Sequence, residues 1–125
     1  AVVGYDLPWH HGPEACLHLM SLISPIGPKM ALIHAPLMPY ALWSDLCDRG
    51  WTLLHAPAEE FEASSGLSLN VLMLAPMDVV MIDGYPRTRS LMEAHGCRVQ
   101  VFVGQALCVA CEGGPTCLTR PVTRG

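Results

Sequence analysis

The chain has 125 residues and a formal net charge of −4, and it carries no basic run, so composition argues against binding to nucleic acid or anionic membranes. Hydrophobic residues make up 51% and charged residues only 14%, a high ratio for one domain's length or less. The longest apolar stretch, from Val71 to Ile82, is interrupted by Pro76 and Asp78 and is too short to span a bilayer. We therefore expect strands buried on both faces, or surface that something outside this sequence covers.

The first half of the chain predicts strands that flank a helix. Its expected elements, in order, are a weak strand at 1–8, a loop at 9–14, strands at 16–23 and 30–35, a helix at 39–49, a strand at 51–56 and a polar connection at 59–68. Pro39 suits the first turn of the helix, and Gly50 suits the left-handed position after its end.

The second half repeats this order. Its expected elements are strands at 70–75 and 79–82, a helix at 86–95 and a strand at 98–103. This helix again has proline near its start, and Gly96 follows its end. The sequence thus predicts an α/β fold of strand-strand-helix-strand modules at about 16–57 and 69–104, with a third module beginning within 112–125.

The repeat also predicts which functional side chains meet. His18 and Asn70 are expected at the same place in successive modules, 52 residues apart (70 minus 18), and Cys117 opens the next module 47 residues further on (117 minus 70). If the modules surround an axis, equivalent first-strand positions converge on it. A thiol and an imidazole would then meet in one pocket.

The C-terminal segment 112–125 holds the candidate nucleophile. Gly113, Gly114 and Pro115 form a tight loop, and Cys117 follows at the start of an expected strand. Two threonines and two arginines that favour a thiolate lie near it in sequence, namely Thr116, Thr119, Arg120 and Arg124. The alternative is a small buried cysteine after a turn.

Three short segments form a recognisable set. They are residues 16–21, Cys-Leu-His-Leu-Met-Ser, residues 70–76, Asn-Val-Leu-Met-Leu-Ala-Pro, and residues 113–121, Gly-Gly-Pro-Thr-Cys-Leu-Thr-Arg-Pro. The set resembles the guanidino-group-modifying superfamily of arginine deiminases, amidinotransferases and dimethylarginine dimethylaminohydrolases. In that order, the segments resemble its catalytic histidine strand, the strand that follows it and the nucleophile motif. The resemblance implies a five-module, pentein-like α/β propeller, of which about half is present.

The resemblance also implies the chemistry. Cys117 corresponds to the nucleophile that attacks a guanidinium carbon, and His18 to the acid and base. Glu112 corresponds to a residue that contacts the small-molecule guanidino substrate, although an exposed loop carboxylate is the equal alternative. Neither a cofactor nor a metal is implied. Met20 stands where deiminases carry Asp, which favours a dimethylargininase-like hydrolase or an amidinotransferase.

Parts of the resembled enzymes have no counterpart here. Their N-terminal modules supply the acidic and arginine residues that hold substrate, so we expect this chain to be incomplete alone. Its partner would be a missing N-terminal half or a second copy, since missing modules leave strand edges open. The same open edges allow a different reading, a non-catalytic remnant that acts as an interaction module.

Cysteine and histidine patterns leave further alternatives open. Six cysteines permit a disulfide framework, but with no visible secretion signal we expect reduced thiols in a cytoplasm. Cys108 and Cys111 have the spacing of a zinc or redox site, for which a second pair is missing. Residues interpreted as structural, loop or surface residues are His10, His11, His34, His55, His95, Glu59 and Glu60.

Overall fold

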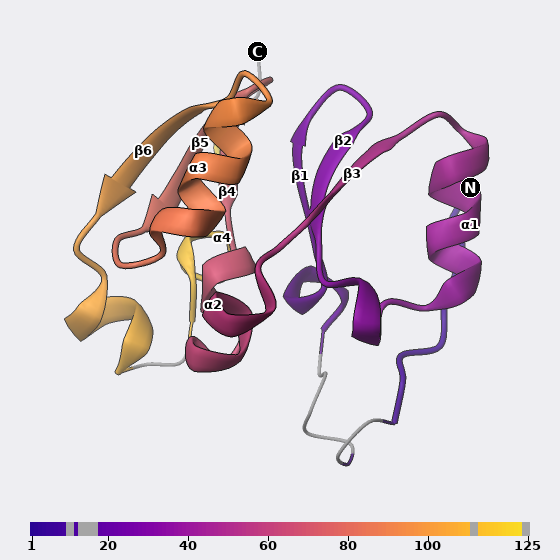
Figure 1. Cartoon of the computed structure of the whole chain (residues 1–125), viewed down its shortest axis with the longest axis horizontal. Coiled ribbons are helices and arrows are strands. Elements are labelled where there is room, and N and C mark those ends of the chain that lie inside the picture. The colour runs from indigo at the N-terminus through magenta and orange to yellow at the C-terminus, as the bar shows by residue number, and fades with distance from the viewer. Residues whose placement is uncertain (10–11, 13–17, 111–112, 124–125) are drawn as a thin grey trace.

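The computed structural model of the chain describes residues 1–9, 12, 18–110 and 113–123. They form two three-stranded sheets, each with its own helix, which lie next to each other (Figure 1). The first module comprises β1 (Ile23–Gly27), β2 (Met30–Ile33), α1 (Tyr40–Asp48) and β3 (Thr52–His55). The second module comprises β4 (Leu72–Ala75), β5 (Asp78–Ile82), α3 (Pro86–Ala94) and β6 (Arg98–Phe102).

Each sheet has the same internal arrangement. The first two strands pair antiparallel, and the second and third pair parallel across the helical connection. The sequence-based prediction of repeated strand-strand-helix-strand modules is confirmed. Gly50 and Gly96, which follow α1 and α3, have φ angles of 73° and 90°, as predicted for left-handed helix ends.

The repeat extends to the irregular parts of the hairpins. A register shift lies between Pro25 and Gly27 in β1, and another lies between Met73 and Ala75 in β4. The hairpin turns place Lys29 and its counterpart 48 residues later (77 minus 29) in the left-handed region, at φ 53° and 65°. Each of these residues follows a proline, a pattern typical of a type II turn.

This spacing corrects one predicted equivalence. The short 3-10 turns η1 (Leu19–Ser21) and η3 (Leu67–Leu69), which precede β1 and β4, are also 48 residues apart (67 minus 19). His18 lies before its turn, whereas Asn70 lies after its own, so the two are not equivalent. The prediction was wrong by one turn because it aligned two polar residues rather than the strands.

Three predicted segments have a different structure. Residues 19–21 form η1 and the strand covers Ile23–Gly27 instead, where Pro25 is tolerated because β1 is an edge strand. The polar connection at 59–68 contains a helix, α2 (Ala58–Ala63). Residues 1–8 form no strand, and the strand expected from Cys117 is replaced by the short helix α4 (Pro115–Leu118).

The modules share one apolar core. Nine buried residues contributed by both sheets and their connections form it: Ile26, Leu32, Leu54, Leu69, Val71, Val79, Met81, Met92 and Cys97. At its edge the Met77 side chain packs so closely on Gly27 that a β-carbon there would overlap its sulfur. Burial of this shared surface holds β1 against β4.

A polar contact also joins the modules. The Ser24 side chain of β1 is 4% exposed, and its hydroxyl donates a hydrogen bond to the Leu69 carbonyl at 2.6 Å. The same oxygen accepts a hydrogen bond from the Val71 amide at 3.3 Å. Ser24 therefore fixes the backbone on both sides of Asn70 from the neighbouring module.

Glu60 links α2 to the start of α3. Its carboxylate accepts hydrogen bonds from the amides of Arg87 and Thr88, both at 2.8 Å, and from the Thr88 hydroxyl at 2.6 Å. These amides are free donors at a helix N-terminus, so Glu60 caps α3. Glu59 forms an exposed ion pair with Arg87.

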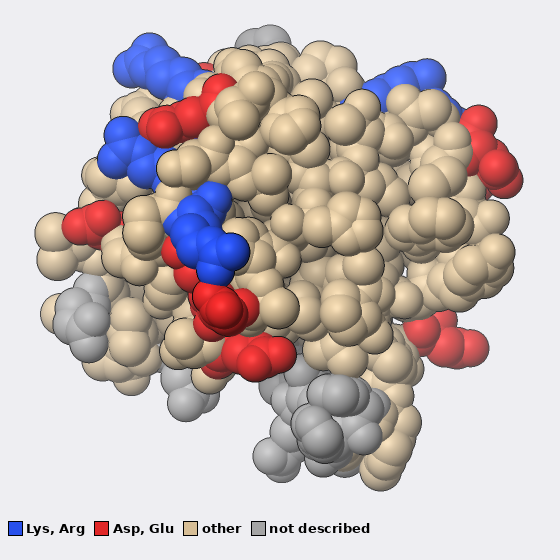
Figure 2. Space-filling model, viewed as in Figure 1, with Lys and Arg blue, Asp and Glu red and all other residues tan. Residues whose placement is uncertain are grey.

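Charges on the molecule alternate in sign rather than forming a basic stripe. Figure 2 shows acidic and basic side chains next to one another on the left half of this face and at its right edge, with an uncharged area between them. Besides the Glu59 pair, ion pairs join Arg49 to Asp45, Arg89 to Glu93, and Arg98 to Asp78. This pattern gives no indication of nucleic-acid binding. Within the described residues, every helix is too short or too polar to cross a bilayer.

The Glu60 cap makes a stability prediction. Burial raises the pKa of Glu60, but hydrogen bonds from Thr88 and Arg87 outweigh it, and the net pKa is lowered. We expect Glu60→Ala to reduce the free energy of unfolding by about 1–2 kcal/mol at pH 7. Since the stabilising form is the carboxylate, the difference from wild type should shrink as the pH falls below about 4.

Glu59→Ala is the matched control, because its ion pair is exposed and should contribute less than about 0.5 kcal/mol. Urea denaturation at pH 7 and pH 3 measures both variants. Equal losses for the two variants at pH 7 would contradict the capping role of Glu60.

Candidate active site

Helix α4 presents the Cys117 thiol at the surface. Pro115 starts the helix, where its missing N–H costs nothing. The Leu118 amide donates to the Gly114 carbonyl at 3.1 Å, and the Thr119 hydroxyl donates to the Pro115 carbonyl at 2.6 Å. These bonds close a single turn whose third residue, Cys117, is exposed.

The Asn70 amide holds α4 in place. Its Nδ2 donates to Cys117 Sγ at 3.0 Å, while its Oδ1 accepts a hydrogen bond from the Thr116 amide at 3.0 Å. The Thr116 hydroxyl donates in turn to the Val71 carbonyl at 3.0 Å. Asn70 is only 6% exposed, so a buried side chain of the second module fixes both the backbone and the sulfur of α4.

Gly114 is needed for this contact. A β-carbon at Gly114 would overlap the Asn70 side chain, at its Cβ, Cγ and Oδ1 atoms. Its φ of −81° is open to any residue, so the requirement is close approach rather than backbone conformation. The second glycine of the Gly-Gly-Pro loop is therefore explained by the Asn70 amide.

The sulfur has a polar partner and is open to solvent. The Asn70 N–H group points at Cys117 Sγ, and the exposure of Cys117 leaves the sulfur accessible to a reactant. Sequence reasoning recognised the strand after Asn70 but did not include Asn70 among the site residues. The available signal was a polar residue placed directly before a buried apolar strand.

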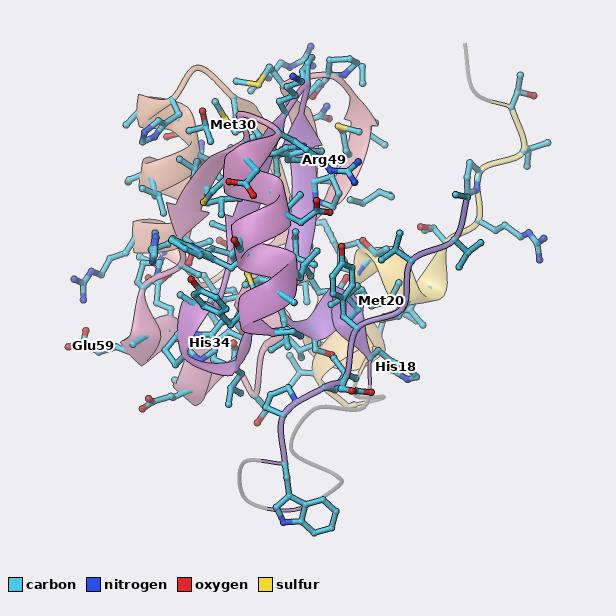
Figure 3. All side chains as sticks on the ribbon, turned by 90° about the vertical axis from the view of Figure 1, so that its right-hand side faces the viewer. His18, Met20, Met30, His34, Arg49 and Glu59 are labelled. Carbon is cyan, nitrogen blue, oxygen red and sulfur yellow. The ribbon has the colours of Figure 1, made fainter. Side chains whose placement is uncertain are left out.

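Met20 and His18 come from η1 of the first module. The Sδ atom of Met20 lies 3.8 Å from Cys117 Sγ, and its side chain is 39% exposed. His18 is the residue before η1, also exposed. In Figure 3 both labelled residues lie on the side of the molecule where the yellow ribbon of α4 is seen. The contact of His18 with the reacting centre stays a prediction.

The remaining candidate residues either lie outside the described part of the chain or have structural contacts. Glu112 lies outside the described residues, as do Cys16, Cys111 and Arg124. His34 is buried and stacks on Phe61 with ring centroids 3.6 Å apart, and His95 Nδ1 is hydrogen-bonded to the Leu91 carbonyl at 2.9 Å. Three of the described cysteines are free thiols: Cys47, Cys97 and Cys117. In the described part of the chain, no group of three or more His, Cys, Asp or Glu residues is arranged so that it could hold a metal ion.

Comparison with known sequences gives one distant relative. The chain matches no protein-family profile. It is 36% identical over 108 residues to an uncharacterized protein of Aeropyrum pernix. The match covers 85% of this chain and 36% of that protein, so the chain spans about a third of the relative's length.

Three solved structures share the fold. An amidinotransferase of saxitoxin biosynthesis from Microseira wollei matches with a TM-score of 0.67 and 22% identity, covering 86% of this chain and 33% of its own. An inosamine-phosphate amidinotransferase from Streptomyces griseus gives 0.66 and 23%, covering 86% and 32%. DDAH from Pseudomonas aeruginosa, complexed with citrulline, gives 0.60 and 21%, covering 81% and 35%.

The chain therefore has the fold of the guanidino-modifying enzymes, the pentein α/β propeller, in part. The matched part of the chain corresponds to about a third of each of these enzymes. The resemblance noted in the sequence is confirmed at the level of the fold.

The close approach at Gly114 yields a test. Gly114→Ala should displace the Asn70 amide, lower the free energy of unfolding by about 1–3 kcal/mol and slow alkylation of Cys117. Gly113→Ala is the control, because a β-carbon there lies 3.4 Å from the flexible Leu118 side chain. Thermal unfolding and iodoacetamide labelling measure both. If the two variants behave alike, the contact between Gly114 and Asn70 does not hold the site.

Proposed function

We propose that this chain carries the nucleophile of an enzyme that cleaves the guanidino C–N bond of an arginine derivative. The observation that carries the proposal is the hydrogen bond from buried Asn70 to the exposed Cys117 sulfur, in a fold shared with two amidinotransferases and DDAH. A resonance-stabilised guanidinium is a poor electrophile, so the reaction requires a strong nucleophile such as a thiolate.

Cys117 acts as nucleophile in the proposed reaction. Its thiolate gives an electron pair to the guanidinium carbon and forms a C–S bond. The C–N bond to the leaving amine breaks as His18 gives that nitrogen a proton. Water, deprotonated by His18, then attacks the same carbon, and breaking the C–S bond returns the thiolate and releases a urea product.

Met20 favours an alkylated guanidine as substrate. Its thioether lies beside the nucleophile, where a carboxylate would instead pair with unsubstituted guanidinium nitrogens. An N-alkyl group can pack on this apolar side chain, which supports a dimethylargininase-like hydrolase. Amidino transfer, in which a second amine replaces water, is the alternative that the two amidinotransferase matches favour.

The remaining substrate contacts would come from elsewhere. The chain covers about a third of the matched enzymes, so a missing N-terminal half or a second copy would supply the groups that hold the guanidinium and the substrate carboxylate. Glu112 would add one acidic contact from this chain. The free thiols of Cys47, Cys97 and Cys117 support a reducing compartment such as the cytoplasm.

A non-catalytic interaction module is the competing function. It is favoured by β6, an edge strand with exposed apolar side chains at Val101 and, just beyond its end, at Val103, which is 84% exposed. The two functions differ in what they require of the Cys117 thiol.

The reactivity of Cys117 tests the choice. We expect a small haloacetamidine at pH 7 to alkylate Cys117 at least about 10-fold faster than Cys47, an exposed thiol on α1 in the same chain. Peptide mass spectrometry after timed quenching measures both rates. Equal rates would favour the interaction module and count against a catalytic cysteine.

Turnover is expected to fail in this chain alone. Positioning contributes about 7–11 kcal/mol to catalysis in favourable cases. We expect the clamps that would provide it on modules that this sequence lacks. Citrulline release from dimethylarginine should therefore be close to the level of a Cys117→Ala control. Turnover at the rate of an ordinary enzyme would show that the pocket is complete without a partner.

A further inference from the structure

A continuous hydrogen-bonded path runs from the first module to the candidate nucleophile. It begins at Ser24, whose hydroxyl bonds the Leu69 carbonyl and the Val71 amide. Between those two backbone groups lies Asn70, whose side chain bonds the Thr116 amide and Cys117 Sγ. Each step joins groups from different parts of the chain, 45 to 47 residues apart.

Through this path, the Ser24 hydroxyl affects where the Asn70 side chain lies relative to the Cys117 sulfur. The amide of Asn70 is buried and bonded at both ends, so its position follows the backbone that carries it. That backbone is held on both sides by one oxygen of another module. Loss of the oxygen leaves the Leu69 carbonyl and the Val71 amide without this partner, and the segment shifts to find others.

We infer that Ser24 is a positioning residue for Cys117, although it does not touch the sulfur; this rests on the proposed function of Cys117. The docking of the first module onto the second thereby becomes part of the active-site machinery. A correctly docked Ser24 places the Asn70 donor on the thiolate, and a shifted interface withdraws it.

The test compares two losses of a buried hydroxyl in the full chain. Ser24→Ala removes the oxygen on the path. Thr88→Val removes a fully buried hydroxyl that bonds Glu60, at α3, and that lies off the path. Iodoacetamide labelling of Cys117 from pH 5 to pH 10, with Cys47 as the internal reference, gives the thiol pKa in each variant, and urea denaturation gives its stability.

Ser24→Ala should slow the labelling of Cys117 near pH 7 by about 3–10-fold, because the Asn70 donor is withdrawn from the sulfur. Thr88→Val should leave the profile unchanged, although both variants lose stability. An unchanged profile in Ser24→Ala would overturn the role of Ser24 alone, if wild-type Cys117 is labelled faster than Cys47. If the two wild-type thiols are labelled at the same rate, the proposed function fails and the inference fails with it.

A second measurement covers the case in which Ser24→Ala does not fold. Coupling along the path is reciprocal, so carboxamidomethylation of Cys117 in the wild-type chain should loosen the bond from the Val71 amide to Ser24. We expect hydrogen exchange of that amide to accelerate at least about threefold, while exchange of the Thr88 amide stays constant. An unchanged rate at Val71 would overturn the inference.

Discussion

The buried amide of Asn70 is the constraint on which the candidate site depends. An amide out of contact with water must find partners for its oxygen and its nitrogen, and here they are the Thr116 amide and the Cys117 sulfur. Gly114 is small because the amide approaches its backbone. The short helix α4 thus has its place set by one side chain of the preceding module.

The modular fold explains how so few residues bring these groups together. Each hairpin repeats its bulge and its left-handed turn residue, so η1 and η3 are placed alike against β1 and β4. The shared core then sets β1 beside β4. Met20 reaches the sulfur from the first module and Asn70 from the second.

Local signals in the sequence were sufficient for α1, α3 and most strands. Proline and glycine at the ends of α1 and α3 act within one turn, so the sequence predicts both helices to within two residues. Such local signals do not predict contacts between residues that are far apart in the sequence. The partners of Asn70 and Ser24 lie 45 to 47 residues away, and α4 replaces a strand because its turn is held by Asn70.

A crystal structure of the chain alkylated by a haloacetamidine tests the central claim most directly, because the adduct places an amidine where the guanidinium would lie. We expect the adduct on Cys117, with its amidine beside Met20 and the Asn70 amide still within hydrogen-bonding distance of the sulfur. The His18 imidazole should contact a nitrogen of the amidine. An adduct directed away from η1, with His18 on the opposite face from the sulfur, would contradict it.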